Sequence, residues 1–265
     1  MAKTIVITSG KGGVGKTTST ANIGTALALQ GKKVCLIDMD IGLRNLDVVL
    51  GLENRIIYDV IDVIEGRAKV HQALIKDKRF DDLLFLLPAA QHADKNAVSP
   101  DDVMEIVAEL DEFYDYILID SPAGIERGFE NSIVAADAAI IITTPEISAI
   151  RDADRIVGIL EQRDIEEPKL VINRIRREMI DSGDIMDVDE ITHHLSLELL
   201  GIIYDDDEVV RTSNKGNPIV LDPDHISSKG YRNIAQRILG NSVPLLTIDK
   251  KEEDRPFWKR LFGIS

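Results

Sequence analysis

A glycine-rich segment near the N-terminus sets the strongest limit on how this chain can fold. Residues 10–17 have the sequence GKGGVGKT, which fits the phosphate-binding pattern G-x-x-x-x-G-K-[ST]. The segment lies between an apolar run at residues 4–8 and a helix-period stretch at residues 17–30, as the motif requires. Its glycines let backbone N–H groups approach phosphate closely, and the start of the following helix adds a partial positive charge. The alternative is a glycine-rich turn that binds no nucleotide. It would not explain why the segment lies between a predicted strand and a predicted helix.

The loop predicts contacts to a nucleoside phosphate from nine consecutive residues. In this arrangement the Lys16 ammonium bridges the β- and γ-phosphates, and the Thr17 hydroxyl is a ligand of Mg²⁺. The predicted contact residues are Gly10, Lys11, Gly12, Gly13, Val14, Gly15, Lys16, Thr17 and Thr18.

Short apolar runs alternate with helix-period stretches along the rest of the chain. Several of the runs are continuous in Val, Ile and Leu, which is typical of parallel strands covered on both faces. Predicted strands are residues 4–8, 33–37, 83–87, 116–119, 138–143, 169–172, 199–203 and 219–221. Predicted helices are residues 17–30, 101–110 (with Ser99 as N-cap and Pro100 at the first position), 148–163 and 225–239. The pattern predicts a single α/β domain with a doubly wound, mostly parallel sheet and the P-loop NTPase fold.

Composition excludes several classes of protein. The 265 residues carry a net charge of −15, which disfavours non-specific binding to nucleic acid. One cysteine excludes an intramolecular disulfide and any site built on cysteine pairs within one chain. No apolar run is long enough to cross a membrane, and the N-terminus lacks the features of a secretion signal, so we expect a cytoplasmic protein.

The C-terminal residues differ in composition from the rest. We expect an ATPase domain at residues 1–245, a polar linker at 246–254 and an amphipathic helix at 255–265. On a helix, the apolar and basic side chains of the last segment fall on opposite sides, which is typical of an interfacial membrane anchor. The predicted membrane-binding residues are Phe257, Trp258, Lys259, Arg260, Leu261 and Phe262. The alternative is a C-terminal helix that packs on the protein's own core.

Acidic residues follow two predicted strands. Asp38 and Asp40 end the second strand, and Asp120 ends the fourth, shortly before Gly124. Ligands of open α/β sheets gather at the carboxyl ends of strands, so these residues should converge on the phosphate loop. We predict that Asp120 and Asp38 join Thr17 around Mg²⁺ and that the Gly124 N–H reaches the γ-phosphate. Taken singly, a strand-end Asp can instead be a turn or helix cap.

The second lysine of the loop, Lys11, goes beyond what one phosphate site needs. With it, GKGGVGKT resembles the deviant Walker A motif of the ParA/MinD family of P-loop ATPases. The resemblance implies an ATP-dependent homodimer in which Lys11 reaches the partner's phosphates, and an Asp40 that orients the attacking water. Lys11, Lys16 and Asp40 are then the catalytic residues of a Mg²⁺-dependent ATPase with ATP and Mg²⁺ as cofactors. It further implies adenine-side contacts from Asn173, Arg174, Asp205 and Asp206.

Within that family, the tail and two internal segments are most similar to the MinD branch. Residues 43–47 (LRNLD) resemble its switch I region, and residues 150–155 (IRDADR) resemble the helix that faces its regulators. The resemblance implies partner contacts from Arg44, Asn45, Arg151 and Asp152, although a run of Asp and Arg is also an ordinary solvated helix face.

The function implied by this branch is placement of the bacterial division site. The expected partners are a second copy, anionic membrane lipid, a MinC-like division inhibitor and a MinE-like activator or polar scaffold, with no nucleic acid. The expected location is the inner face of the cell membrane, reached peripherally from the cytoplasm. The alternatives are a ParA-type DNA-partitioning ATPase and an adaptor that binds nucleotide without hydrolysing it.

Overall fold

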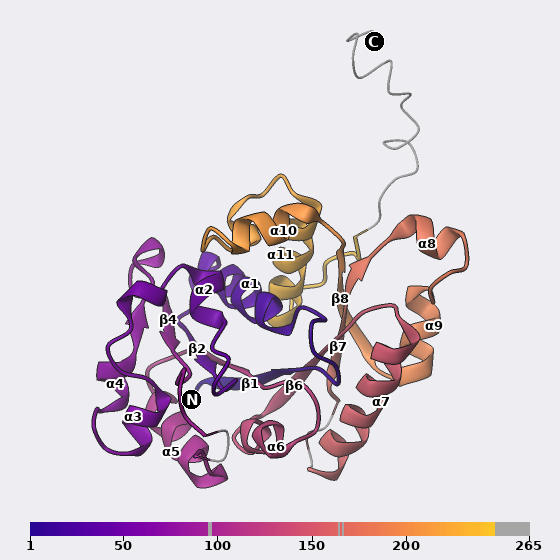
Figure 1. Ribbon diagram of the computed structural model, residues 1–265. Coiled ribbons are helices and arrows are strands. Elements are labelled where there is room, and N and C mark those ends of the chain that lie inside the picture. The colour runs from indigo at the N-terminus through magenta and orange to yellow at the C-terminus, as the bar shows by residue number, and fades with distance from the viewer. Residues whose placement is uncertain (95–96, 164, 166, 247–265) are drawn as a thin grey trace, which may run out of the picture.

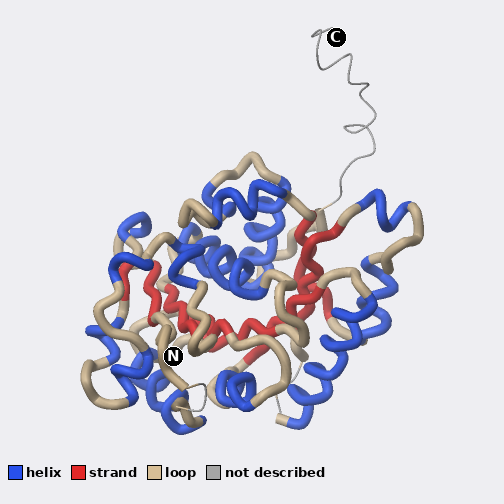
Figure 2. The backbone as a smooth tube through the Cα atoms, in the orientation of Figure 1, coloured by secondary structure: helices blue, strands red, loops and turns tan. Residues whose placement is uncertain are grey.

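The chain folds around one eight-stranded sheet. The computed structural model describes residues 1–94, 97–163, 165 and 167–246. The strands run in the spatial order β3-β4-β2-β5-β1-β6-β7-β8 and are parallel except for β3 (Figure 2). Their bounds are β1 (Lys3–Thr8), β2 (Val34–Asp38), β3 (Ile75–Lys76), β4 (Leu84–Leu87), β5 (Tyr116–Asp120), β6 (Ala138–Thr143), β7 (Lys169–Ile175) and β8 (Glu198–Tyr204).

Helices cover both faces of the sheet (Figure 1). One face carries α1 (Lys16–Leu29), α2 (Leu46–Leu50), α10 (Asp207–Ser213), η3 (Ile219–Leu221) and α11 (Ile226–Ile238). The other face carries α3 (Val60–Ile64), α4 (Val70–Ala73), α5 (Pro100–Leu110), α6 (Arg127–Ile133), α7 (Ile147–Gln162) and α9 (Val188–Leu195). Short elements complete the chain: η1 (Glu53–Arg55), η2 (Lys78–Phe80) and α8 (Arg177–Asp181).

Alternate residues of the central strands supply two separate apolar cores. In β1, Val6 belongs to the core under α7, whereas Ile5 and Ile7 belong to the core under α1. All three are nearly inaccessible to solvent. Because both faces are buried, the strands need continuous apolar runs, which is why the sequence pattern located them.

The predicted doubly wound α/β sheet is confirmed, and one of its predicted strands is wrong. Residues 219–221 form the 3₁₀ helix η3, preceded by Pro218. The segment is buried because it packs on α1, where the Asn22 side chain accepts a hydrogen bond from the Val220 N–H at 2.9 Å. The apolar run therefore marked burial, and three residues were too few to distinguish a strand from a helical turn.

The two-residue strand β3 was not predicted. It lies antiparallel to β4 at one edge of the sheet, with Ile75 opposite Leu86. By contrast, the predicted start of α5 is confirmed: Ser99 is the N-cap and its Oγ accepts a hydrogen bond from the Asp102 N–H.

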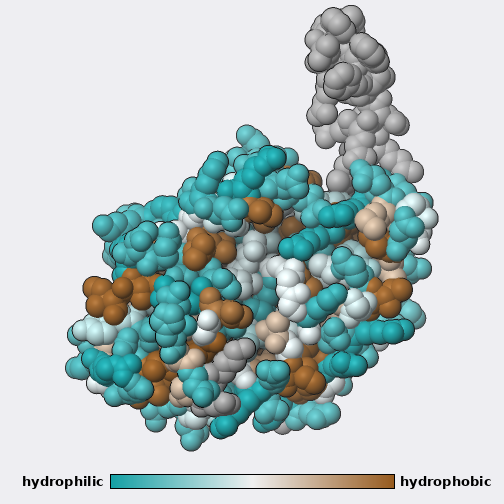
Figure 3. All heavy atoms as spheres, viewed as in Figure 1, coloured by the Kyte–Doolittle hydropathy of each residue, from teal (hydrophilic) through white to brown (hydrophobic). Residues whose placement is uncertain are grey.

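The visible surface is mixed in character. Figure 3 shows a face on which hydrophilic side chains surround separate groups of hydrophobic ones. Among the described residues, no helix has both the length and the apolar character needed to cross a membrane.

Candidate nucleotide site

The glycine-rich loop connects β1 to α1 at the carboxyl edge of the sheet. Gly15 precedes α1 with φ 94°, a left-handed conformation that favours glycine, and no side chain caps the helix. The Asn173 amide donates to the Val14 carbonyl at 2.8 Å, and a Cβ on Gly15 would lie 2.3 Å from the same amide nitrogen. Gly15 is therefore required both by its backbone angle and by its neighbour. The N–H groups of the first turn of α1 are available to an anion.

A cavity of about 530 Å³ opens beside this loop. It lies between the loop, the segment after β2 and the segment after β5, all at the carboxyl ends of central strands. Its lining residues are Ser9, Lys11, Gly12, Gly13, Gly15, Lys16, Thr17, Thr18, Met39, Asp40, Ile41, Leu43, Asn45, Val49, Val98, Pro122, Ala123, Glu126, Arg127, Gly128, Asn131 and Arg174. Most of the predicted loop residues and Asp40 thus share one cavity wall, whereas Gly10 and Val14 do not line it.

Lys16 and Asp120 form a buried ion pair under the loop. The Lys16 Nζ lies 2.9 Å from Asp120 Oδ1, and the two side chains are 7 % and 0 % exposed. The Thr20 hydroxyl donates to the same oxygen at 3.1 Å, while Asp120 Oδ2 is buried without a hydrogen-bond partner among the described residues. A buried carboxylate oxygen with no donor is suited to a cation.

Asp38 is the second buried carboxyl group at this place. Burial, and next the nearby Asp120, raise the pKa of Asp38 to about 7, although N–H groups of Asp40 and Leu46 donate to it at 3.0 and 3.2 Å. A hard divalent cation placed between the two buried carboxyl groups would stabilise the charged form of Asp38. The predicted magnesium residues Asp38 and Asp120 therefore fit Mg²⁺, and Thr17 lines the adjoining cavity.

The other predicted lysine, Lys11, is exposed and contacts α7. Its Nζ donates to the Ser148 hydroxyl at 2.8 Å. Beside it, the loop backbone lies against the same helix, because a Cβ on Gly10 would be 2.2 Å from the Asp152 carbonyl oxygen. The loop and α7 are therefore packed directly together. Gly124, predicted to reach phosphate, donates its N–H to the Ser9 carbonyl at 3.0 Å in this structure.

The predicted adenine-side residues have separate surroundings. Arg174 has φ 55° and lines the cavity, whereas the Asn173 side chain is buried against the loop. Asp205 pairs with Arg176 at 2.6 Å. Neither Asp205 nor Asp206 lines the cavity, so their predicted contact with the base stays a prediction.

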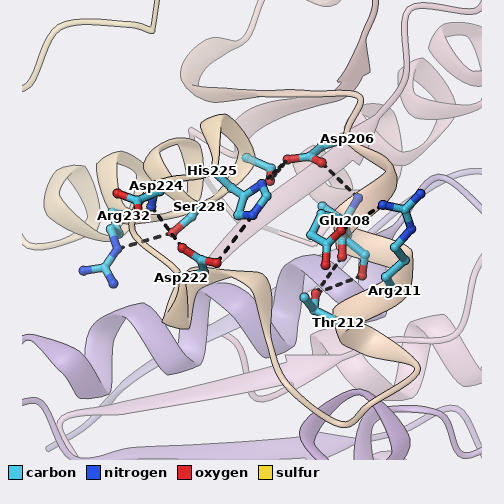
Figure 4. A network of polar contacts seen from close by, with 11 residues as sticks. Asp206, Glu208, Arg211, Thr212, Asp222, Asp224, His225, Ser228 and Arg232 are labelled. Carbon is cyan, nitrogen blue, oxygen red and sulfur yellow. Dashed lines mark hydrogen bonds and ion pairs between the residues drawn. The ribbon is translucent and has the colours of Figure 1, made fainter.

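Asp206 lies in a polar network between α10 and α11 (Figure 4). It is the N-cap of α10 and accepts hydrogen bonds from the Glu208 N–H at 2.9 Å and the Ser227 hydroxyl at 2.7 Å. His225 Nδ1 lies 3.6 Å from Asp206, and its Nε2 lies 3.4 Å from Asp222. The network joins the loop after β8 to the start of α11.

The four predicted partner-binding residues lie on two segments next to the cavity. Arg44 has φ 37° and its Nε lies 3.0 Å from Asp47, with a side chain only 18 % exposed, so most of it faces inward. Asn45 is the N-cap of α2 and lines the cavity. On α7, Arg151 is exposed and Asp152 is half-buried and 3.5 Å from Arg155.

Sequence reasoning missed the far wall of the cavity. There the Asn131 amide donates to the Val98 carbonyl at 2.6 Å, which joins α6 to the segment before α5. Glu126 and Arg127 also line this wall. The polar pair Glu126 and Arg127, two and three residues after Gly124, was a signal that could have been followed, whereas nothing in the sequence relates residue 98 to residue 131.

The linker from residue 247 onward and the predicted membrane-binding residues 257–262 lie outside the described residues.

Comparison with known proteins agrees with the fold and with a nucleotide-binding family. The family model described as "CobQ/CobB/MinD/ParA nucleotide binding domain" matches residues 5–219. The septum site-determining protein MinD of Bacillus subtilis is 63% identical over 254 residues, covering 96% of this chain and 95% of the relative. Among solved structures, the MinC:MinD cell division protein complex of Aquifex aeolicus matches with a TM-score of 0.87 and 50% identity, covering 93% and 99% of the two chains.

A third relative bears on the ligand. The septum site-determining protein MinD of Pyrococcus horikoshii, solved in complex with Mg-ADP, matches with a TM-score of 0.82 and 30% identity, covering 90% and 96% of the chains. The chain described here belongs to the MinD branch of the CobQ/CobB/MinD/ParA family of nucleotide-binding proteins.

Proposed function

We propose that this protein is a Mg²⁺-dependent ATPase that pairs with a second copy on ATP, attaches to the membrane through residues 255–265 and places the division site by recruiting a MinC-like inhibitor. The observation that carries the proposal is the position of two lysines in one loop. Lys16 is buried beneath the cavity, and Lys11 is exposed on its wall. A lysine that faces solvent at the cavity can reach a second molecule's phosphates, whereas Lys16 can serve only its own site.

The roles of the residues follow from their surroundings. The loop amides and Lys16 hold the phosphates, while Thr17, Asp38 and Asp120 hold Mg²⁺, which neutralises phosphate charge when bound. Asp40 orients the water that attacks the γ-phosphate. In the pair, each site gains the partner's Lys11 as a further cationic group at the phosphates, so hydrolysis by the single chain should be slower than hydrolysis by the pair.

Membrane attachment depends on pairing. Burying a few apolar side chains at an interface is offset by the entropy of ordering the residues that carry them, so one C-terminal segment binds weakly. Two segments on one dimer gain roughly 10²–10⁴ in apparent affinity. ATP therefore switches attachment on, and hydrolysis switches it off.

The proposed partner is suggested by a relative whose structure was solved as a complex. The Aquifex aeolicus relative was solved as a MinC:MinD complex. In this chain, the exposed surface of α7 and the segment before α2 lie next to the nucleotide cavity, and we assign the partner contacts to them. We infer that Arg151, Asp152 and Asn45 contact a MinC-like protein, with Arg44 supporting the segment from within. A MinE-like activator or a polar scaffold would act on the same surface.

The test measures co-sedimentation with vesicles of phosphatidylglycerol and phosphatidylcholine in ATP and in ADP, together with phosphate release. We expect the full chain to bind in ATP and to release phosphate faster when vesicles are present. A chain ending at Asp254 should keep its basal phosphate release and lose vesicle binding.

Three results would contradict the proposal. Equal vesicle binding in ATP and ADP would exclude the switch. Phosphate release that is unchanged in Lys16→Ala and Asp40→Ala would indicate an adaptor without hydrolysis. Stimulation by duplex DNA rather than by vesicles would favour a DNA-partitioning ATPase.

A further inference from the structure

Residues 241–246, here called the strap, turn back along α11 after that helix ends. The turn is made at Gly240, which has φ 85°, and the Asn241 N–H donates to the Gln236 carbonyl at 3.0 Å. In Figure 1 the yellow end of the described chain lies beside β8.

Three contacts give the strap its direction. The Val243 carbonyl accepts from Arg237, the Pro244 carbonyl lies 3.5 Å from the Asn233 amide, and Leu246 lies close to Gly230. The strap therefore runs antiparallel to α11.

The same helix residues contact β8 in order, which shows where the strap leads. The Arg237 guanidinium contacts Leu200 near the start of β8, and Gly230 contacts Ile203 near its end. The strap thus begins near the amino end of β8 and finishes near its carboxyl end. It therefore carries the chain from the edge of the sheet at the amino ends of the strands to the edge at their carboxyl ends, where the nucleotide cavity lies.

Arg237 makes the main hydrogen bonds that hold the strap in place. Its Nε and Nη2 donate to the Val243 carbonyl at 3.1 and 2.6 Å, and its Nη1 donates to the Leu200 carbonyl at 2.7 Å. One planar side chain thus ties the strap, α11 and β8 together, a geometry that lysine cannot reproduce. Leu246 fastens the other end, where it packs on the apolar core.

We propose that Arg237 and the strap fix the point from which the C-terminal segment leaves the body, so that Arg237 is a positioning residue for membrane attachment. This inference rests on the proposed function. Release of the strap lengthens the connection to residue 255 from eight residues to fourteen. Effective concentration falls roughly as the −3/2 power of that length, which is about twofold for each tail. The starting point also moves back along β8 by about 10 Å, the rise of the three residue steps from Leu200 to Ile203.

The experiment uses the full chain and vesicles of phosphatidylglycerol and phosphatidylcholine in ATP. We expect Arg237→Ala and Arg237→Lys to lower the apparent vesicle affinity about 3- to 10-fold, with phosphate release in the absence of vesicles within twofold of the parent. The lysine variant keeps the charge, so a loss there reflects geometry rather than attraction to lipid. Arg232→Ala is the matched control, because Arg232 lies on the same helix and bonds the Val220 carbonyl instead of the strap.

Three further measurements keep the inference falsifiable. Cleavage by chymotrypsin after Leu245 and Leu246 should quicken in Arg237→Ala, because the strap is no longer held on α11. Leu246→Ser, which frees the other end, should weaken vesicle binding by itself. Deleting residues 247–252 from Arg237→Ala should restore binding, since the connection returns to eight residues. Vesicle binding by Arg237→Ala equal to that of the parent would overturn the inference, whereas a parent that shows no ATP-dependent binding would overturn the proposed function beneath it.

Discussion

At the scale of single residues, one lysine lies among two buried acids beneath the phosphate loop. The Lys16 ammonium faces Asp120 directly, and Asp120 lies close enough to Asp38 to disfavour the ionisation of Asp38. The positive side chain is thus the counter-ion for two buried acids. Removing it should affect the stability of the protein and not only its affinity for phosphate.

We therefore expect Lys16→Ala to lower the free energy of unfolding by about 3 kcal/mol, because it leaves a buried carboxylate without its partner. Lys11→Ala is the matched control in the same loop. Its side chain is exposed, so the change should stay within about 0.5 kcal/mol. Urea denaturation without nucleotide measures both, and equal stability of the two variants would contradict the assignment of Lys16 as counter-ion.

Asp38 gives a prediction on pH. Its pKa rises from about 4 in an unfolded chain to about 7 in the fold, so between these values the folded protein binds more protons than the unfolded chain. The contribution of this group to stability is present below about pH 4 and is lost as pH rises through 7.

The check compares the parent with Asp38→Asn, which mimics the protonated form, by chemical denaturation without nucleotide from pH 5 to pH 8. The stability of the parent relative to the variant should decrease across this range. A difference that is constant, or that increases with pH, would show that Asp38 does not titrate there.

At the scale of elements, the loop and α7 act as one packed unit. The Gly10 backbone lies against the backbone of Asp152, and Lys11 bonds Ser148 one turn earlier. The segment proposed to contact regulators is thus adjacent to the segment that contacts phosphate.

Substitutions at two glycines of the loop distinguish the effect of this packing from the effect of losing glycine's backbone flexibility. We expect Gly10→Ala to destabilise the protein by about 2 kcal/mol or more, because its Cβ would lie 2.2 Å from a backbone oxygen. Gly12→Ala should change stability by less than about 0.5 kcal/mol, since nothing lies within 4 Å of the added carbon. Thermal unfolding of the two variants tests this, and a Gly10→Ala protein as stable as Gly12→Ala would show that the contact can relax.

The elements differ in how far the sequence could predict them. Strands such as β6 were located because both of their faces are buried, which forces an unbroken apolar run. Residues 219–221 are equally apolar, yet they pack on α1 through Asn22, a residue about 200 positions away. A local pattern reports burial and cannot report which partner provides it.

In the candidate site, too, some features could be predicted from a local sequence pattern and others could not. The loop and the strand-end acids could be predicted because phosphate and Mg²⁺ chemistry requires those residue types at those positions. The pairing of Lys11 with Ser148, the Asn173 contact to the loop and the wall formed by Asn131 and Val98 could not, since each joins segments that only the folded chain brings together.

At the scale of the whole molecule, a clasp centred on Arg79 joins three distant segments. Its guanidinium pairs with Asp77 at 2.6 Å and donates to the carbonyls of Leu50 and Gly216 at 2.6 and 3.0 Å. At the same place the backbones of Gly51 and Gly216 meet so closely that a Cβ on Gly216 would lie 2.3 Å from the Gly51 Cα. The clasp thus connects the end of α2, the segment after β3 and the segment after α10.

We expect Arg79→Ala to lower the free energy of unfolding by about 3 kcal/mol, because Asp77 is only 2 % exposed and would lose its partner. Arg155→Ala removes the exposed pair with Asp152 and should cost less than about 1 kcal/mol. Equilibrium denaturation of both variants provides the comparison. A loss of similar size in the two variants would mean that the clasp contributes no more than a surface pair.

The outer margins of the sheet have a consequence for crowded conditions. At one margin β3 offers only two residues, in the opposite direction to the rest, and at the other the Leu200 carbonyl already accepts a guanidinium hydrogen bond. A ninth strand from a second chain could pair with only two residues at β3. At β8 it would meet a carbonyl that already accepts a hydrogen bond. Both features disfavour extension of the sheet from one copy into the next when many copies are close together.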